Sequence, residues 1–142
     1  MLAIVALWVF INYRRVDTAG HAGRLDDSLT SRLASAEVFM DIGDIELGVD
    51  FEDAITKAVA SCEVMLSLIG VRWATVETSD GTRRLDDPDD YVATEIAAAL
   101  ERQIRLVPLL IDGARKLRAE ELPERLRGLA RRNALTLHRH VG

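Results

Sequence analysis

The sequence contains a single cysteine, Cys62, among 142 residues. One thiol cannot form an intramolecular disulfide, so the sequence excludes a disulfide-stapled secreted domain and favours a reducing, cytoplasmic compartment. Because Cys62 falls near the end of a predicted helix, we interpret it as a small buried apolar residue rather than a nucleophile. No histidine has zinc-ligand spacing with acids or cysteines, so no metal site is predicted at His21, His138 or His140.

Basic charge is also scarce. Lysine and arginine together number 18 against 23 aspartates and glutamates, which gives a formal net charge of −5. A protein that binds duplex DNA needs a net basic footprint, so nucleic acid is not expected as a partner. The sequence has no Walker, G-x-G-x-x-G or G-x-S-x-G motif, and it therefore predicts no bound cofactor.

The one long apolar run covers residues 1–11. It is too short to span a bilayer. It also has no basic segment before it and no small-residue cleavage site ahead of residues 12–15, as a signal peptide would require. A strand that is buried on both faces produces the same run. We therefore predict a central strand over residues 3–13 and no membrane association.

The remaining composition is that of one globular domain over residues 1–142, with 49% hydrophobic and 29% charged residues. Apolar runs alternate with amphipathic stretches, which is typical of repeated βα units on a parallel sheet. The predicted strands are 3–13, 38–42, 63–70, 104–111 and 135–138. The predicted helices are 21–34, 51–61, 88–102 with Asp87 as its N-cap, and 121–133. This pattern predicts an α/β fold of the flavodoxin-like kind, a doubly wound five-stranded parallel sheet with helices on both faces.

In such folds, ligands bind beyond the carboxyl ends of the strands. Residues 13–20, 41–50 and 70–90, together with the start of the next helix, are therefore the candidate site regions. Charge is unevenly placed as well: residues 37–53 hold seven acids and no lysine or arginine, whereas residues 115–140 are rich in arginine. These segments are either two solvated faces or complementary poles for head-to-tail self-association.

Three segments in the first half of the chain share a further pattern. Residues 9–15 have the sequence VFINYRR, residues 38–42 have VFMDI, and residues 45–48 have IELG, followed by Phe51. They resemble the first strand, the second strand and the BB loop of the TIR (Toll/interleukin-1 receptor-like) domain family. The opening motif of that family is VFISYRR, with serine at the position of Asn12.

Later segments resemble the same family in the same order. Residues 66–70, followed by Trp73, resemble its third strand and the exit from it, and residues 104–108 resemble its fourth strand. Residues 91–96 have the sequence YVATEI, which resembles the aromatic-x-x-x-Glu motif of TIR enzymes that hydrolyse NAD⁺. The resemblance covers nearly the whole chain, and it is to bacterial TIR domains of the NADase type.

The resemblance implies both an activity and a mode of assembly. TIR enzymes of this type break the bond between nicotinamide and ribose, with NAD⁺ as substrate, and release ADP-ribose or a cyclised form of it. Other TIR domains are non-catalytic adaptors that signal through self-association. In related enzymes the BB loop of a neighbouring subunit completes the active site, so TIR–TIR contacts are expected through Gly43 to Asp50. Family analogy also favours a role in bacterial immunity.

Glu95 is the candidate catalytic residue. Cleavage of an N-glycosidic bond develops positive charge on the ribose, and a nearby carboxylate stabilises that transition state. Nicotinamide is a cationic leaving group that needs no general acid, so one carboxylate suffices. Tyr91 lies one helical turn earlier on the same face, where its ring can stack on nicotinamide or ribose. The alternative interpretation is that Glu95 is only a solvated helix residue.

Six further residues are candidates for substrate binding, namely Tyr13, Arg14, Arg15, Glu46, Phe51 and Trp73. Arg14 and Arg15 follow the first strand, where guanidinium groups could meet the pyrophosphate of NAD⁺ or pair with local acids. Glu46 and Phe51 occupy BB-loop positions that resemble substrate-lining or gating residues, although Phe51 also opens an apolar helix face. Trp73 is either part of the pocket wall or a packed core aromatic.

Two other enzyme or signalling classes share features with this chain. A phosphoacceptor receiver domain has the same fold class but needs an aspartate at the end of the third strand, where residues 67–70 have none. A nucleoside deoxyribosyltransferase also places a carboxylate beside an N-glycosidic bond. The segments 10–15 and 45–48 favour a TIR domain over it.

Overall fold

The structure is a computed structural model that describes residues 7–33, 35–40 and 48–137. Its strands are β1 (Leu7–Asn12), β2 (Ala36–Phe39), β3 (Val64–Ile69), β4 (Arg105–Ile111) and β5 (Leu135–Leu137). They form one sheet in the order β2-β1-β3-β4-β5, and every neighbouring pair is parallel. This order is the flavodoxin-like one, in which the topological switch point lies between β1 and β3. The predicted α/β fold is confirmed.

The described residues contain three α-helices and three 3₁₀ segments. The helices are α1 (Arg15–Arg32), α2 (Phe51–Ala60) and α3 (Tyr91–Glu101). The 3₁₀ segments are η1 (Arg84–Asp86), η2 (Ala119–Glu121) and η3 (Glu124–Arg131). Within these residues, no helix is both long enough and apolar enough to cross a membrane, and no three potential metal ligands gather in one place.

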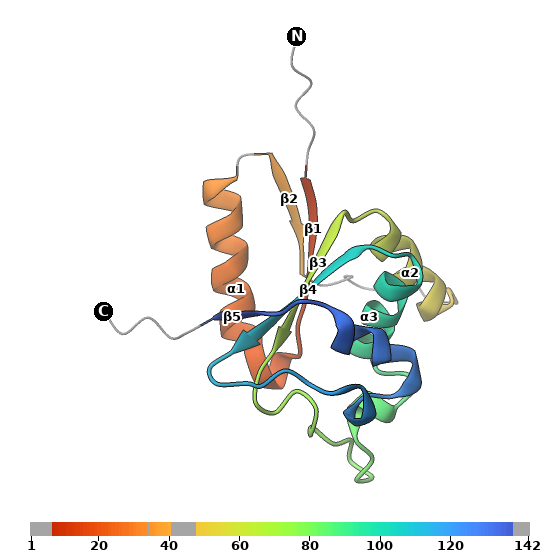
Figure 1. Cartoon of the computed structure of the whole chain (residues 1–142). Coiled ribbons are helices and arrows are strands. Elements are labelled where there is room, and N and C mark those ends of the chain that lie inside the picture. The colour runs from red at the N-terminus through yellow and green to blue at the C-terminus, as the bar shows by residue number, and fades with distance from the viewer. Residues whose placement is uncertain (1–6, 34, 41–47, 138–142) are drawn as a thin grey trace.

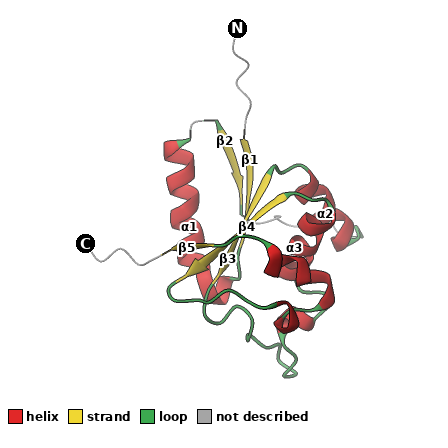
Figure 2. Ribbon diagram, viewed as in Figure 1, coloured by secondary structure: helices red, strands yellow, loops and turns green. Residues whose placement is uncertain are grey.

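Helices cover both faces of the sheet (Figures 1 and 2). Successive side chains of a strand point to opposite faces, so adjacent residues of β1 enter different cores. Ile11 packs with Ala22 of α1 on one face. Phe10 packs with Ile55 of α2 and Ile96 of α3 on the other. The central strands are therefore buried on both sides, which explains their nearly continuous apolar sequences.

The first helix differs from the prediction, because α1 begins at Arg15 instead of residue 21. Its first turn is separated from the rest by a non-helical residue, Thr18, with φ −137° and ψ 21°. The carboxylate of Asp17 accepts hydrogen bonds from the backbone N–H of Gly70 at 2.9 Å and of Arg72 at 3.3 Å. This tertiary anchor to the end of β3 holds a turn that has no apolar periodicity of its own.

The start of α3 also differs from the prediction. Asp90 is the N-cap, and its side chain accepts a hydrogen bond from the backbone N–H of Ala93. Asp87, the predicted cap, follows η1 and instead accepts a hydrogen bond from the backbone N–H of Asp89 at 2.9 Å. Both aspartates suit an N-cap locally, so only the tertiary structure distinguishes them.

The predicted helix over residues 121–133 is wrong in type. The segment is 3₁₀, and η3 begins directly after Pro123. Its two buried side chains, Leu126 and Leu129, are three residues apart, which is one full turn of a 3₁₀-helix. The strand predicted over residues 135–138 is observed as β5 up to Leu137. His138 and residues 41–42 of the predicted second strand lie outside the described residues.

Gly70 offers a test of the anchor between α1 and β3. A Cβ atom at this position would clash with both carboxylate oxygens of Asp17. We expect Gly70→Ala to lower the free energy of unfolding by about 1–3 kcal/mol, because either the backbone shifts or Asp17 loses its hydrogen bonds. Gly23→Ala is the matched control, since a Cβ atom there meets nothing within 4 Å and alanine favours helix. Urea unfolding followed by circular dichroism measures both. Equal midpoints for the two variants would contradict the anchor.

Candidate active site

α3 presents Glu95 to the sheet. Three small residues of the same helix, Ala93, Ala98 and Ala99, are buried as well. Glu95 is only 7% exposed. The interpretation of Glu95 as a solvated helix residue is therefore wrong. A buried carboxylate acts in surroundings where electrostatic interactions are stronger than in water.

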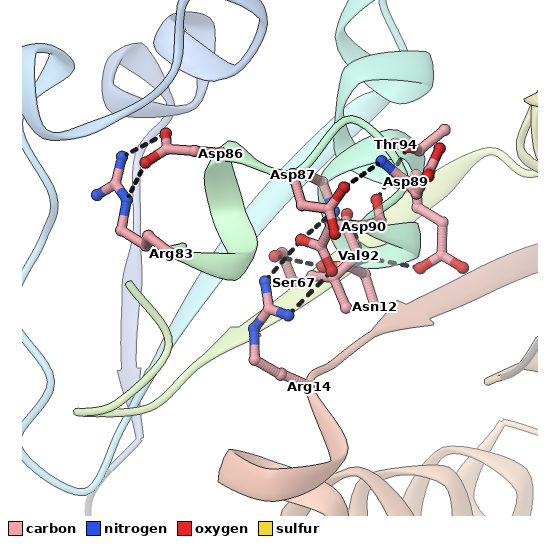
Figure 3. Close-up of polar contacts among 12 residues, drawn as sticks. Asn12, Arg14, Ser67, Arg83, Asp86, Asp87, Asp89, Asp90, Val92 and Thr94 are labelled. Carbon is pink, nitrogen blue, oxygen red and sulfur yellow. Dashed lines mark hydrogen bonds and ion pairs between the residues drawn. The ribbon is translucent and has the colours of Figure 1, made fainter. Parts of the chain in front are cut away.

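A buried chain of hydrogen bonds leads from Ser67 of β3 through Asn12 of β1 to Glu95. Figure 3 shows Ser67 and Asn12. Asn12 pairs with Ser67 in the parallel register of the two strands, and both side chains are fully buried. The Ser67 hydroxyl donates to Asn12 Oδ1 at 2.8 Å. Asn12 Nδ2 donates to Glu95 Oε1 at 2.8 Å and to the backbone carbonyl of Val92 at 3.1 Å. The carboxylate is thus tied to β1 and, through Asn12, to β3.

An ion pair links the segment after β1 to the start of α3. Arg14 is 2% exposed, and its guanidinium donates to the two carboxylate oxygens of Asp90 at 3.0 and 2.8 Å. The same Asp90 side chain caps α3. The guanidinium carbon of Arg14 also lies 5.9 Å from the ring centroid of Trp73. A bidentate arginine–carboxylate pair of this kind fixes orientation as well as distance.

An aromatic pair lies at the first residues of α2 and α3. The rings of Phe51 and Tyr91 stack with their centroids 5.3 Å apart and their planes 22° apart. Tyr91 is 50% exposed, whereas Phe51 is partly buried against the larger core. Phe51 therefore supports a ring whose other side is available, one helical turn from Glu95.

A cleft of about 910 Å³ lies beside these groups, which is within the range of roughly 300–1,000 Å³ that is common for ligand sites. Its wall contains Tyr13, Arg14, Arg15, Tyr91 and Glu95. The segment between β3 and α3 adds a further part of the wall, including Thr78, Ser79 and Arg84. The cleft thus lies beyond the carboxyl ends of the strands, where this topology places ligands.

A family model described as "TIR domain" matches residues 9–140. The chain belongs to the TIR domain family. Among solved structures, the TIR domains of the activated Roq1 resistosome that recognises the pathogen effector XopQ are similar, with a TM-score of 0.56 and 15% identity over 88% of this chain and 68% of that one. A metazoan TIR-STING receptor from C. gigas has a TM-score of 0.49 and 19% identity over 91% of this chain and 38% of that one. No curated protein sequence matches.

Most residues singled out in the sequence lie close together in this TIR domain. Tyr13, Arg14, Arg15, Tyr91 and Glu95 share the cleft, although the guanidinium of Arg14 is engaged by Asp90.

Two candidates lie elsewhere and one is outside the described residues. Trp73 is 1% exposed, belongs to the core and does not line the cleft, so its interpretation as a packed aromatic is the correct one. Phe51 acts behind Tyr91 and is not part of the cleft wall. Glu46 falls in residues 41–47, which are not described.

The segment between β3 and α3 is held by Arg83 (Figure 3). Its guanidinium donates two hydrogen bonds of 2.9 Å to Asp86 and one of 2.8 Å to the backbone carbonyl of Glu121. The bonds from Arg83 lower the pKa of the Asp86 carboxyl from its ordinary value. The next residue, Arg84, is exposed and reaches the cleft. Arg83 therefore fastens the segment that carries Arg84.

Four neighbours of the candidate site are not predicted from the sequence, namely Asn12, Ser67, Arg84 and Asp90. A signal for two of them is present in the sequence. Asn12 and Ser67 are polar residues within strands that are otherwise apolar, and a buried polar side chain requires a partner. The partners of Asp90 and Arg84 depend on tertiary structure, and the local sequence carries no comparable signal for them.

The ion pair between Arg14 and Asp90 can be measured by a double-mutant cycle. Both side chains are buried, at 2% and 7% exposed. Arg14→Met leaves an uncompensated buried carboxylate, so we expect it to lower the free energy of unfolding by about 3–5 kcal/mol. Asp90→Asn retains a good N-cap and isolates the loss of charge. In urea unfolding, the double variant should lose less than the sum of the two single variants. Strict additivity would contradict a direct coupling.

Proposed function

We propose that this TIR domain cleaves the bond between nicotinamide and ribose in NAD⁺. The observation that carries the proposal is the buried Glu95 carboxylate in the wall of a cleft, one helical turn from the half-exposed ring of Tyr91. The aromatic-x-x-x-Glu motif of the sequence supports it, because both residues of the motif line one cleft. The chain is accordingly a proposed NAD⁺ nucleosidase, with NAD⁺ as the substrate rather than a cofactor.

The chemistry requires only one carboxylate. As the C1′–N1 bond breaks, its electron pair leaves with nicotinamide, which becomes neutral, and positive charge grows on the ribose. The negative charge of Glu95 stabilises this oxocarbenium-like state. Water then adds at C1′ and releases a proton, which yields ADP-ribose. Attack at C1′ by a nucleophile of the ADP-ribosyl group itself would yield a cyclic product, so hydrolase and cyclase reactions share the same first step.

The other residues of the cleft have distinct proposed roles. Tyr91 stacks on the nicotinamide or the ribose, supported from behind by Phe51. Arg15 and Arg84 line the cleft, and their guanidinium groups suit the pyrophosphate oxygens. Arg14 acts mainly through Asp90, whose position it fixes. Tyr13 remains a proposed contact in the cleft wall.

The catalytic role of Glu95 is tested by substitution. We expect Glu95→Ala to retain the fold and to lower the rate of nicotinamide release by at least about 10²–10³-fold, since removal of one group that stabilises the developing charge has this effect in other enzymes. Glu101→Ala is the control on the same helix, because Glu101 is exposed at the end of α3. Chromatographic separation of nicotinamide and ADP-ribose products measures both variants. Unchanged turnover by Glu95→Ala would remove the mechanism.

A second function, a non-catalytic scaffold with homotypic contacts, is supported by the placement of charge. Asp50, Glu52 and Asp53 are exposed at the start of α2, whereas Arg127 and Arg131 are exposed on η3. Opposite charges on two separate elements suit a head-to-tail contact between copies. If the BB loop of one copy completes the cleft of another, scaffold and enzyme are the same assembly.

Self-association gives a prediction of its own. We expect sedimentation velocity to show assembly that weakens with added salt, because exposed charges are screened at higher ionic strength. The rate of nicotinamide release per molecule should then rise with protein concentration. Arg131→Glu should reduce both, and Arg24→Glu on α1, away from η3, is the charge-matched control. A specific activity that is constant at all concentrations would contradict a shared active site. Salt-sensitive assembly without any loss of NAD⁺ would contradict the enzyme and support only the non-catalytic scaffold.

A further inference from the structure

We infer that Asn12 is a positioning residue that sets the orientation and the charge state of Glu95. This inference rests on the proposed function and adds to it a residue that does not touch the substrate. Asn12 is fully buried at the end of β1, and its side-chain amide is 2.8 Å from Glu95 Oε1. Asn12, its partner Ser67 and Glu95 come from three elements, β1, β3 and α3 respectively.

The orientation of the Asn12 amide is decided by its partners. The backbone carbonyl of Val92 can only accept a hydrogen bond, so the atom 3.1 Å from it is the NH₂ nitrogen. That nitrogen also faces Glu95. The opposite end of the amide, Oδ1, accepts from the Ser67 hydroxyl at 2.8 Å. A flipped amide would place its oxygen against two acceptors, and it is therefore excluded.

The fixed orientation favours one charge state of Glu95. An NH₂ group donates and cannot accept, so its hydrogen bond stabilises the carboxylate and offers nothing to a protonated carboxyl oxygen at the same place. Burial acts in the opposite direction, because it disfavours charge. The proposed transition state needs the charged form. Asn12 thus opposes the effect of burial at the residue where the negative charge is required.

The same hydrogen bonds fix the position of the carboxylate. Ser67 and Asn12 lie on two neighbouring interior strands of the sheet, in register with one another. Asn12 also holds the Val92 carbonyl in the first turn of α3. A group that is held from rigid elements keeps a productive geometry more precisely than one on a loop. The ion pair of Arg14 and Asp90 fixes the beginning of α3 separately.

Asn12→Asp is the sharpest test, because it is nearly isosteric and keeps the oxygen that accepts from Ser67. It replaces the donor beside Glu95 with a second carboxylate oxygen, so the two acids compete for one proton and titrate as a pair. We expect kcat for nicotinamide release to fall on the order of 10- to 100-fold, as when a reacting group is misplaced, while KM changes by less than about 3-fold. The acidic limb of the pH profile of kcat should move to higher pH. Asn133→Asp, at an exposed position, is the matched control and should change neither.

Other charges of the cleft must be kept constant in this comparison, namely Arg14, Arg15, Arg84, Asp87, Asp89 and Asp90. All of them are present in both variants. A shift of the acidic limb that occurs in Asn12→Asp and not in Asn133→Asp is therefore caused by the carboxyl group introduced beside Glu95. Ser67→Ala is the second variant, in case Asn12→Asp does not fold. It leaves the donor in place but releases its anchor, so kcat should fall less and the acidic limb should move little.

The outcomes separate this inference from the proposed function. Wild-type kcat together with an unmoved acidic limb in Asn12→Asp overturns the positioning role, and so does a change that appears only in KM. Carbon-13 NMR of the labelled Glu95 carboxyl follows its titration directly and needs no turnover. If the wild-type protein releases no nicotinamide, the proposed function fails. A carboxyl that then titrates alike in wild type and Asn12→Asp overturns the inference as well, whereas titration at higher pH in Asn12→Asp upholds the coupling.

Discussion

The hydrogen bonds of one buried amide join two neighbouring interior strands, β1 and β3, to the helix that carries the candidate carboxylate. Asn12 contacts Ser67 of β3 and both Val92 and Glu95 of α3. An unpaired amide in this position would carry the full cost of desolvation, about 1–3 kcal/mol, so the arrangement of strands and helix must satisfy it. The Arg14–Asp90 ion pair holds α3 at a second point. The wall of the cleft that α3 forms is therefore fixed to the ends of the strands.

Much of the fold follows from the sequence because its signals are local. Strands buried on both faces appear as apolar runs, and their alternation with amphipathic stretches predicts a parallel sheet. The errors occur where tertiary contacts decide between local options. The first turn of α1 is held by Asp17 contacts to Gly70 and Arg72. The start of α3 depends on which of two aspartates caps it. The type of η3 depends on which of its side chains are buried, and these are two leucines three residues apart, Leu126 and Leu129.

The candidate site divides in the same way. Tyr13, Arg15, Tyr91 and Glu95 are found together because strand ends and a helix start converge at a known edge of this topology. Trp73 shows the limit, since an aromatic after a strand fits a pocket wall or a core equally well until its burial is known. The pairing of Asn12 with Ser67 depends on strand order and register, across 55 positions of the chain. Sequence patterns indicate that each needs a partner, and they do not identify it.

The stack of Phe51 on Tyr91 means that the aromatic edge of the cleft belongs to two helices at once. Phe51 is the first residue of α2 and directly follows Asp50, the cap of that helix. The pose of the Tyr91 ring is therefore not a property of α3 alone. A displacement of the first turn of α2 would change the pose of the Tyr91 ring in the cleft wall, although Phe51 itself does not line the cleft. The shape of this aromatic edge therefore depends on α2 as well as on α3. Substitutions in α2 can change that shape without contacting the cleft.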